Sequence, residues 1–377
     1  MEYRLDELFD LQMGKTPSRS NPDYWNSGEH QWISIADLSK SKKYINSTKE
    51  YLSEKAIRES GIAIIPANTV IMSFKLSIGK TAITTEPMYS NEAIMSFKDR
   101  HVVELLPEYI YYLLSSKDWD AGANKAVMGK TLNKATLSAI KVCVHSISEQ
   151  QKIVYLLNKV DGIITARQQQ LQKLDDLVKA RFVEMFGDPK SNPHEYEKPQ
   201  LKETCKVITG NTPSRAIREY YGDCLEWIKT DNIVSGVLNP TAAVEKLSRS
   251  GVDVGRTVDA GTILMACIAG SIASIGRVCV TDRKVAFNQQ INAIVPQKYN
   301  VLFLYTLLQI SKDYLVEEIN MALKGILSKS KLEEKHFILP PMESQDEFAS
   351  FVAQVDKSRF VVQQAFIHNH FERRFEI

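Results

Sequence analysis

The sequence predicts an α+β protein made of two similar halves. Two mixed α/β domains, related by a pseudo-two-fold axis, are expected to be separated by two long antiparallel helices that form a coiled coil. Two observations predict this fold. Short motifs occur twice, in the same order and roughly 195 residues apart. Each half also ends in a segment whose apolar residues recur at alternating steps of four and three.

The composition is that of an ordinary globular protein. The chain has 377 residues, a formal net charge of +2 and 44% hydrophobic residues, with no apolar run long enough to cross a bilayer. The five cysteines are scattered and no C-x-x-C occurs, which argues against a disulfide framework or a zinc site. We expect a cytoplasmic protein with no membrane contact and no metal site.

The clearest repeated motif is a small basic loop. "GKTPSR" at Gly14–Arg19 returns as "GNTPSR" at Gly210–Arg215. Chance matches would not keep one order along the whole chain, so the halves are duplicates. The other pairs are Gln31–Ser39 with Glu226–Ser235, Asn68–Phe74 with Gly261–Cys267, Leu76–Ile83 with Ala273–Val280, Asn91–Phe97 with Asn288–Ile294, Tyr109–Leu114 with Phe303–Leu308, and Ser148–Asp161 with Glu343–Asp356.

The globular part of each half is predicted to be rich in β-strands that turn at glycines. Thr281–Val285 is predicted to be a hairpin turn between two strands. Leu106–Asp120 is predicted to be a helix, because Pro107 suits a first helical turn. The expected domains are residues 1–147 and 199–342, joined by a linker at 187–198.

A long helix is predicted at residues 148–186 and a second at 343–377. Ser148 and Gln151 form a weak capping box, and Gly187 with Pro189 stops the first helix. A helix of about 36 residues is roughly 54 Å long and cannot bury its apolar stripe alone. The two helices are therefore expected to pack on each other, although such a helix can also dimerise a protein with itself. The residues predicted to pack are Ile153, Leu157, Val160, Ile164, Leu171, Leu174 and Val178 in the first helix, with Arg167, Arg181 and Met185 continuing its seam, and Phe348, Val352, Val355, Val362 and Phe366 in the second, with Arg359 in its seam.

No catalytic site is predicted. "NPDYW" at Asn21–Trp25 resembles an N-P-P-Y methyltransferase motif, but it lacks the second proline and a glycine-rich cofactor motif. Gly270–Gly276 is not followed by the lysine of a phosphate-binding loop. Asp282 and Lys284 form a D-x-K triplet of the kind found in nucleases, yet it lies in a predicted turn. We therefore expect a protein that is not an enzyme and binds no cofactor.

Both halves instead repeat polar loops near glycines. Cations and small hydroxyls contact DNA phosphates, and Arg, Lys and Asn also read base edges. Taken singly, each loop is equally well explained as a turn, but three loops in each of two copies favour DNA. The predicted DNA-binding residues are Lys15, Thr16, Ser18, Arg19, Lys75, Ser77, Lys80, Lys130, Asn133 and Lys134 in the first half, and Asn211, Thr212, Ser214, Arg215, Ser271, Ser274, Arg277, Lys324, Ser328 and Lys329 in the second.

Together these motifs resemble the specificity subunit of Type I restriction-modification systems. The resemblance rests on G-[KN]-T-P-S-R, Trp-Ile, S-I-G-[KR], Asn-[EQ] and the helix ending at Leu177–Pro189, and it covers essentially the whole chain. It implies two target-recognition domains that read a bipartite double-stranded DNA target, with the helices as a ruler. It also implies two modification subunits that supply S-adenosylmethionine and adenine methylation. A restriction subunit would add ATP and Mg²⁺ chemistry.

The chain departs from its own pattern at one place. Asn369 and Arg373 stand in the second helix where the first has Leu174 and Val178, so the far end of the second helix is expected to fray or to pack on a partner.

Ser39–Glu50 differs strongly from Ser235–Glu245, which predicts two different half-sites. Two alternatives stay open: a stand-alone DNA-binding or scaffold protein without a methyltransferase partner, and an enzyme with an unrecognised site.

Overall fold

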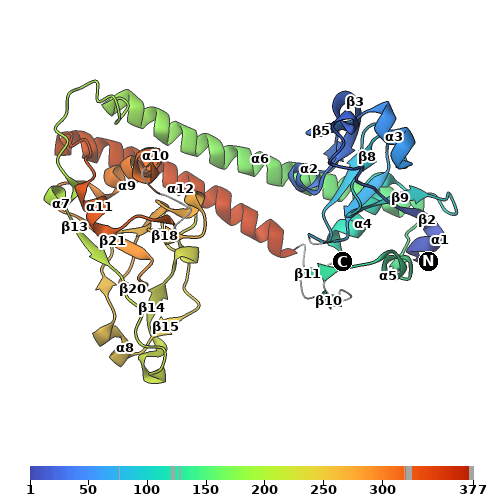
Figure 1. Cartoon of the computed structure of the whole chain (residues 1–377). Helices are drawn as coiled ribbons and strands as arrows, with labels where there is room; N and C mark the ends of the chain where they lie inside the picture. Colours follow the sequence, from blue (N-terminus) through green and yellow to red (C-terminus); the bar gives the residue numbers. More distant parts are fainter. Residues whose placement is uncertain (76, 120–123, 127–128, 318, 320–324, 373–377) are drawn as a thin grey trace. The chain divides into compact units, whose positions relative to one another are not determined.

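A computed structural model describes the chain except at residues 76, 120–123, 127–128, 318, 320–324 and 373–377; at 124–126, 129–131 and 360–372 only the backbone is described. The chain divides into two compact units, Met1–Gly162 and Ile163–Ile377. The division falls inside one long helix, α6 (Ile147–Phe186). In Figure 1, α6 is green and the second long helix, α12 (Met342–Glu372), is red.

The first unit contains two main sheets. In the larger, the strand order is β2-β9-β6-β7-β4, antiparallel except where β4 runs parallel to β7. In the smaller, β3 lies between β5 and β8 and is parallel to β8. The strands are β2 (Phe9–Met13), β3 (Trp25–Ile33), β4 (Tyr44–Ile45), β5 (Glu50–Leu52), β6 (Val70–Ser73), β7 (Thr81–Thr84), β8 (Tyr89–Ser90) and β9 (Ile94–Asp99), with the small pairs β1 (Glu2–Arg4) with β12 (Lys141–Cys143) and β10 (Asn124–Ala126) with β11 (Gly129–Thr131). The helices before α6 are α1 (Leu5–Leu8), α2 (Ile35–Lys40), α3 (Glu54–Ser60), α4 (Pro107–Ser116) and α5 (Lys134–Ser138).

The second unit repeats this plan. The sheet β13-β21-β17-β19 corresponds strand for strand to β2-β9-β6-β7, and β14 is parallel to β20 as β3 is to β8. The strands are β13 (Cys205–Thr209), β14 (Tyr221–Ile228), β15 (Lys246–Leu247), β16 (Thr257–Val258), β17 (Ile263–Ala266), β18 (Ile268–Ala269), β19 (Val278–Val280), β20 (Val285–Phe287), β21 (Ile291–Pro296) and β22 (Gly325–Ile326). The helices are α7 (Leu201–Thr204), α8 (Arg249–Val254), α9 (Val301–Ile310), α10 (Lys312–Val316) and α11 (Lys329–Glu334), followed by α12. This shared topology confirms the duplication that the motifs predict.

The central strand of each larger sheet is buried on both faces. All four residues of β6 and of β17 are buried, which explains why apolar residues do not alternate with polar ones along them; Ser73 at the end of β6 is the one polar residue. One face packs on α4 or α9, where Tyr109 and Phe303 are buried. The other face packs toward the smaller sheet. Each unit is thus built on a sheet held between a helix and a second sheet.

Two predicted elements differ from the structure. The helix predicted at Leu106–Asp120 ends at Ser116, because Trp119 turns back into the core and donates its ring N–H to the carbonyl of Leu114 (2.8 Å). That indole fills the place of a side chain at Gly79, where an added Cβ would lie 2.8 Å from the ring.

The hairpin predicted at Thr281–Val285 is wrong. The strand before the turn, β19, belongs to the larger sheet, and the strand after it, β20, belongs to the smaller one. All three residues of β20 are buried, and Ala286 and Phe287 pair in parallel with β14. The turn therefore carries the chain from the larger sheet to the smaller one, and the strands on both sides of it are fully buried.

The antiparallel packing of the long helices is confirmed. Arg181 of α6 forms an ion pair with Glu347 of α12 (2.9 Å), while Asp175, nearer the start of α6, meets Arg359, further along α12 (2.6 Å). Phe348, Val352 and Val355 are buried with Val178 in one core. The other seam residues Ile153, Leu157, Val160, Ile164, Leu171 and Leu174 are half-buried, and the side chains of Val362 and Phe366 lie outside the described residues.

The heptad pattern missed the most buried apolar residues of α6. Phe182 and Phe186 are fully buried, with Phe182 stacked on Phe303 of α9 at 5.5 Å between ring centroids. They follow Val178 at successive steps of four, whereas the heptad seam alternates steps of four and three. Arg181, predicted on the seam, is half-buried and forms ion pairs with Glu184 and Glu347. The end of α6 is therefore part of the second unit's core.

Candidate nucleic-acid interface

The two Gly-x-Thr-Pro-Ser-Arg loops follow equivalent strands, β2 and β13. At Gly14 an added Cβ would lie 2.2 Å from the carbonyl oxygen of Ser90, and at Gly210 it would lie 2.1 Å from that of Asn288. A Cβ cannot approach backbone so closely, so both positions need glycine. The loop is thereby pressed against the turn that precedes β9 or β21.

The backbone of each loop is fixed by a buried tryptophan. The indole N–H of Trp32 donates to the carbonyl of Lys15 (3.1 Å), and that of Trp227 donates to the carbonyl of Asn211 (3.2 Å). Both tryptophans are nearly fully buried at the end of the long strand of the smaller sheet. Trp32 and Trp227 belong to the repeated Trp-Ile motif, whose role is now clear: it anchors the loop.

The arginine of each loop lies over aromatic rings. The Arg19 guanidinium is 3.7 Å from the Trp25 ring centroid and pairs with Glu50, with one contact of 3.1 Å. Arg215 lies 4.5 Å from the Tyr221 ring and 2.6 Å from Glu245. These arginines hold the first strand of the smaller sheet to its neighbour in both units. Their predicted DNA contact remains a prediction, and the geometry favours a structural role.

The Glu245 carboxylate also pairs with Lys229 (2.8 Å). The hydrogen bond from Lys229, and after it the one from Arg215, lowers the pKa of Glu245. The same carboxylate thus links the loop arginine to a lysine that directly follows β14, so Arg215 is one member of a small charged network.

Other polar groups of the first loop are also used within the fold. Thr16 donates to Glu92 and Thr212 donates to Gln289, the second residue of each Asn-[EQ] motif. The Lys15 ammonium donates to the carbonyl of Ser60. Ser18 and Ser214 are exposed.

The second loop lies beside the same turn. The N–H of Phe74 donates to the carbonyl of Ala93 (3.0 Å), and that of Cys267 donates to the carbonyl of Gln290 (2.8 Å). Lys80 is exposed; its backbone bonds to Ser73, while its ammonium has no hydrogen-bond or ion-pair partner among the described residues. Arg277 instead donates to the carbonyls of Ser274 and Thr230, each at 3.3 Å. The remaining predicted residues here, Lys75, Ser77, Ser271 and Ser274, lie in the loop with the Oγ atoms of the last two 3.0 Å apart.

The third loop pairs with the second. The N–H of Leu132 donates to the carbonyl of Phe74 (3.0 Å), and that of Leu327 to the carbonyl of Cys267 (2.8 Å). Asn133 and Ser328 are N-caps: their side chains accept from the N–H of Thr136 (2.8 Å) and of Lys331 (3.3 Å). Lys134 is exposed, Lys329 lies 3.5 Å from Glu333, and the side chains of Lys130 and Lys324 lie outside the described residues.

In each unit the structure brings all three predicted loops together around one turn. That turn is Asn91–Ala93 in the first unit and Asn288–Gln290 in the second. Sequence reasoning missed this turn as the centre of the site, although the repeated Asn-[EQ] motif was the available signal. The contacts join residues some 76 positions apart, so no local pattern reveals them.

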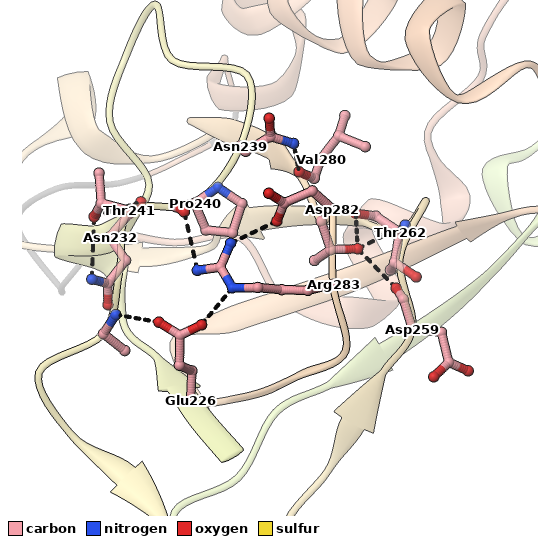
Figure 2. A network of polar contacts seen from close by, with 12 residues as sticks. Glu226, Asn232, Asn239, Pro240, Thr241, Asp259, Thr262, Val280, Asp282 and Arg283 are labelled. Carbon is pink, nitrogen blue, oxygen red and sulfur yellow. Dashed lines mark hydrogen bonds and ion pairs between the residues drawn. The ribbon is translucent and has the colours of Figure 1, made fainter. Parts of the chain in front are cut away.

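A charged network distinguishes the second unit. Figure 2 shows Arg283 between Glu226, Asp282 and the carbonyl of Pro240. The Arg283 hydrogen bond lowers the pKa of Glu226, whose other oxygen accepts from the N–H of Ala243 (2.8 Å). The aspartate of the D-x-K triplet is thus bound to an arginine. In the first unit Gln31 stands in the place of Glu226 and contacts Glu86. The two units thus hold the loop after the first long strand of the smaller sheet by different chemistry.

Within the described part of the chain, no group of three His, Cys, Asp or Glu residues could hold a metal ion. Nor does any described helix combine the length and the apolar character needed to cross a membrane.

One prediction concerns the loop arginine. Arg19→Ala is expected to lower the free energy of unfolding by about 1 kcal/mol, because a half-exposed cation over an aromatic ring is lost. Urea denaturation of the full chain measures this. If Arg19 instead contacts phosphate, the slope of log affinity for DNA against log salt falls by about one unit. Arg58→Ala, which removes an exposed cation of α3, is the matched control.

Comparison with known proteins identifies the family. A family model described as the Type I restriction modification DNA specificity domain matches residues 1–175 and 193–364. The chain is 25% identical to the Type I restriction enzyme MjaIX specificity subunit of Methanocaldococcus jannaschii, over 93% of this chain and 85% of that one. It is 28% identical to the EcoR124I/EcoR124II specificity subunit of Escherichia coli over 42% of this chain and 40% of that one.

A solved structure shares the fold. The Type I restriction-modification S subunit from M. genitalium superposes with a TM-score of 0.55 at 14% identity, covering 99% of this chain and 94% of that one. Together with the family model, which matches nearly the whole chain, the duplicated domains and paired long helices show that the chain belongs to the Type I restriction-modification specificity family, as a non-catalytic subunit that recognises a DNA target.

Proposed function

We propose that the chain reads a bipartite, asymmetric DNA target, with one half-site for each recognition domain and an unread gap set by the long helices. One observation carries the proposal: the same three-loop site is built twice on one scaffold, and α6 leads from one copy to the other. Two equivalent reading sites in one chain suit a target with two parts.

The half-sites are expected to differ. The loop after the first long strand is held by Gln31 and Glu86 in one unit and by Glu226 and Arg283 in the other. The intervening sequences, Ser39–Glu50 and Ser235–Glu245, share little. We expect base contacts in the major groove, because only that groove distinguishes all four base pairs.

The length of α6 limits the target. A helix of 40 residues is roughly 60 Å long at about 1.5 Å per residue. Duplex DNA rises about 3.4 Å per base pair, so the half-sites are expected to lie within roughly 18 base pairs of each other. If both domains dock on one face of the duplex, the centres of the two half-sites are expected to lie about one helical turn of DNA apart.

We further propose that two modification subunits dock on the chain and carry out adenine methylation. S-adenosylmethionine would be bound by those subunits, and ATP with Mg²⁺ by restriction subunits in a complete system. A protein that acts on chromosomal DNA is expected in the cytoplasm.

Docking of the modification subunits is supported by an apolar stripe on α6. Leu156, Ile163 and Leu177 are 59%, 45% and 47% exposed and lie at multiples of seven residues, hence on one face of the helix.

A second prediction tests this stripe. Leu177→Glu is expected to weaken binding of the modification subunit about tenfold or more, because a leucine buried in an interface contributes roughly 1.5–3 kcal/mol. Affinity is measured by titrating the purified subunit encoded beside this gene. Gln169→Glu adds the same charge at an exposed position of α6 and serves as control. Equal affinities for the two variants would remove the stripe from the interface.

The function itself is tested by methylome sequencing of the host with and without this gene. We expect one class of methylated adenines, in a two-part motif of fixed gap, to disappear in the deletion. A stand-alone DNA-binding or scaffold protein would leave the methylome unchanged while the purified chain still bound DNA. The absence of any neighbouring methyltransferase reading frame would favour that alternative.

A further inference from the structure

In the first unit a lysine joins a recognition loop to the long helix. The carbonyl of Lys43 accepts the N–H of Ile83 in β7 (2.8 Å), which fixes the loop on the sheet just before β4. The Lys43 ammonium donates to Oδ1 of Asn158 on α6 and lies 4.7 Å from the ring centroid of Tyr112 on α4. One side chain thus spans loop and helix.

Asp161, one turn further along α6, completes this contact. The Tyr112 hydroxyl donates to Oδ2 of Asp161 at 2.7 Å. Burial lowers the pKa of the Lys43 ammonium, and the negative charges of Asp161 and Glu108 oppose that shift. The half-buried lysine thus lies near a carboxylate, in a position where an unpaired charge would be costly.

The second unit makes the same connection between loop and long helix, but here the cation belongs to the helix and not to the loop. The carbonyl of Leu238 accepts the N–H of Val280 in β19 (2.7 Å), so Leu238 takes the place of Lys43. The cation is Arg359 of α12. Its Nη1 donates to the carbonyl of Gly236 in the loop (3.2 Å) and to Oδ1 of Asp175 (2.6 Å).

Asp356 corresponds to Asp161, because each is the last residue of the repeated motif that begins the long helix. Oδ1 of Asp356 lies 3.6 Å from Nε of Arg359, whose side chain is only 12% exposed. Burial raises the pKa of Asp356, and the Arg359 charge opposes this. Gly236 has a φ of +76° and faces the guanidinium, so the loop is shaped for this contact.

We propose that Asp161 and Asp356 are equivalent positioning residues. Through Lys43 and Arg359, each holds the loop after the first long strand against a long helix and so fixes the angle at which its recognition domain meets that helix. The proposal rests on the proposed function, because this angle affects activity only if the protein measures a gap between two half-sites.

The test uses the complete complex with its modification subunits. Initial methylation rates are measured on duplexes with the native gap and with the gap one base pair shorter or longer. For Asp161→Asn, Asp356→Asn and Arg359→Met we expect the preference for the native gap to fall about tenfold, the size of effect seen when contacting partners are uncoupled. Preference for the correct half-site bases is expected to stay unchanged. Arg359→Lys, which keeps the charge, is expected to recover part of the loss.

Asp176→Asn is the matched control, since Asp176 is an exposed acid of α6 that contacts Gln172. Unchanged gap preference in Asp161→Asn and Arg359→Met would overturn the proposal, and so would a loss of half-site preference, which would assign these residues to base reading. If Asp161→Asn fails to fold, Lys43→Met decides the question for the first unit. A wild-type complex that shows no gap preference would refute the proposed function instead.

Discussion

Insertion of two helical turns, about seven residues, between Leu171 and Leu177 is expected to lengthen the unread gap by about one to three base pairs and to leave both half-sites unchanged. The insertion adds roughly 10 Å of helix, and each base pair adds about 3.4 Å of duplex. Each added base pair also rotates one half-site about the DNA axis by roughly 34°. That rotation is why we expect fewer pairs than length alone would give.

A seven-residue insertion keeps the heptad seam in phase, whereas four residues would introduce a stutter. Within this range the insertion is placed ahead of Asp175, so that the contacts of Asp175, Val178 and Arg181 with α12 are preserved. Methylome sequencing of a host carrying the variant measures the result. Alanines at Gln168, Gln169 and Gln170 change the same surface without changing its length and serve as control. Altered half-site bases with an unaltered gap would disprove the ruler.

Phe182→Ala is expected to lower the free energy of unfolding by about 3–5 kcal/mol, the usual cost of removing a buried phenyl ring. Phe182 is fully buried, with ring centroids of Phe186, Phe303 and Phe348 at 5.1, 5.5 and 5.4 Å. The ring thus joins α6, α9 and α12 at one point. Its loss leaves a cavity among three helices that are fixed by their other contacts.

Urea denaturation followed by circular dichroism measures this loss. Val183→Ala is the control, because Val183 is the next residue of α6 and is 48% exposed. It is expected to change stability by less than about 0.5 kcal/mol. A loss below 1 kcal/mol for Phe182→Ala would mean that the end of α6 is not part of the second unit's core.

The repeat made most of the fold predictable, because two copies must satisfy the same packing. Gly14 and Gly210 shared a motif, and the structure gives the reason: a backbone oxygen occupies the space of a side chain. The stop at Gly187 followed from local chemistry, and Gly187 has a φ of +71°. Such features depend on a few neighbouring residues, which the sequence shows directly.

Contacts between distant residues could not be predicted in this way. Arg19 looked like a free cation, since Trp25 and Glu50, which bind it, are adjacent only after the smaller sheet forms. Thr281–Val285 had the composition of a hairpin turn, but pairing of β20 with β14 sends the chain to another sheet. Phe182 was one position from the heptad seam, and only α9 explains its burial.

The core around Phe182 and Phe186 also bears on how such genes can recombine. The segment 187–198, which the sequence predicts to be a linker, is the obvious crossover point for exchanging the globular part that follows it. A domain transplanted from there would leave its two core phenylalanines, and the Asp175 partner of Arg359, behind in the recipient. A crossover ahead of Leu174 would move the domain together with its own helical support. Functional chimeras are therefore expected to have their junctions inside α6, and a working hybrid joined at the linker would require a recipient helix that already carries matching residues.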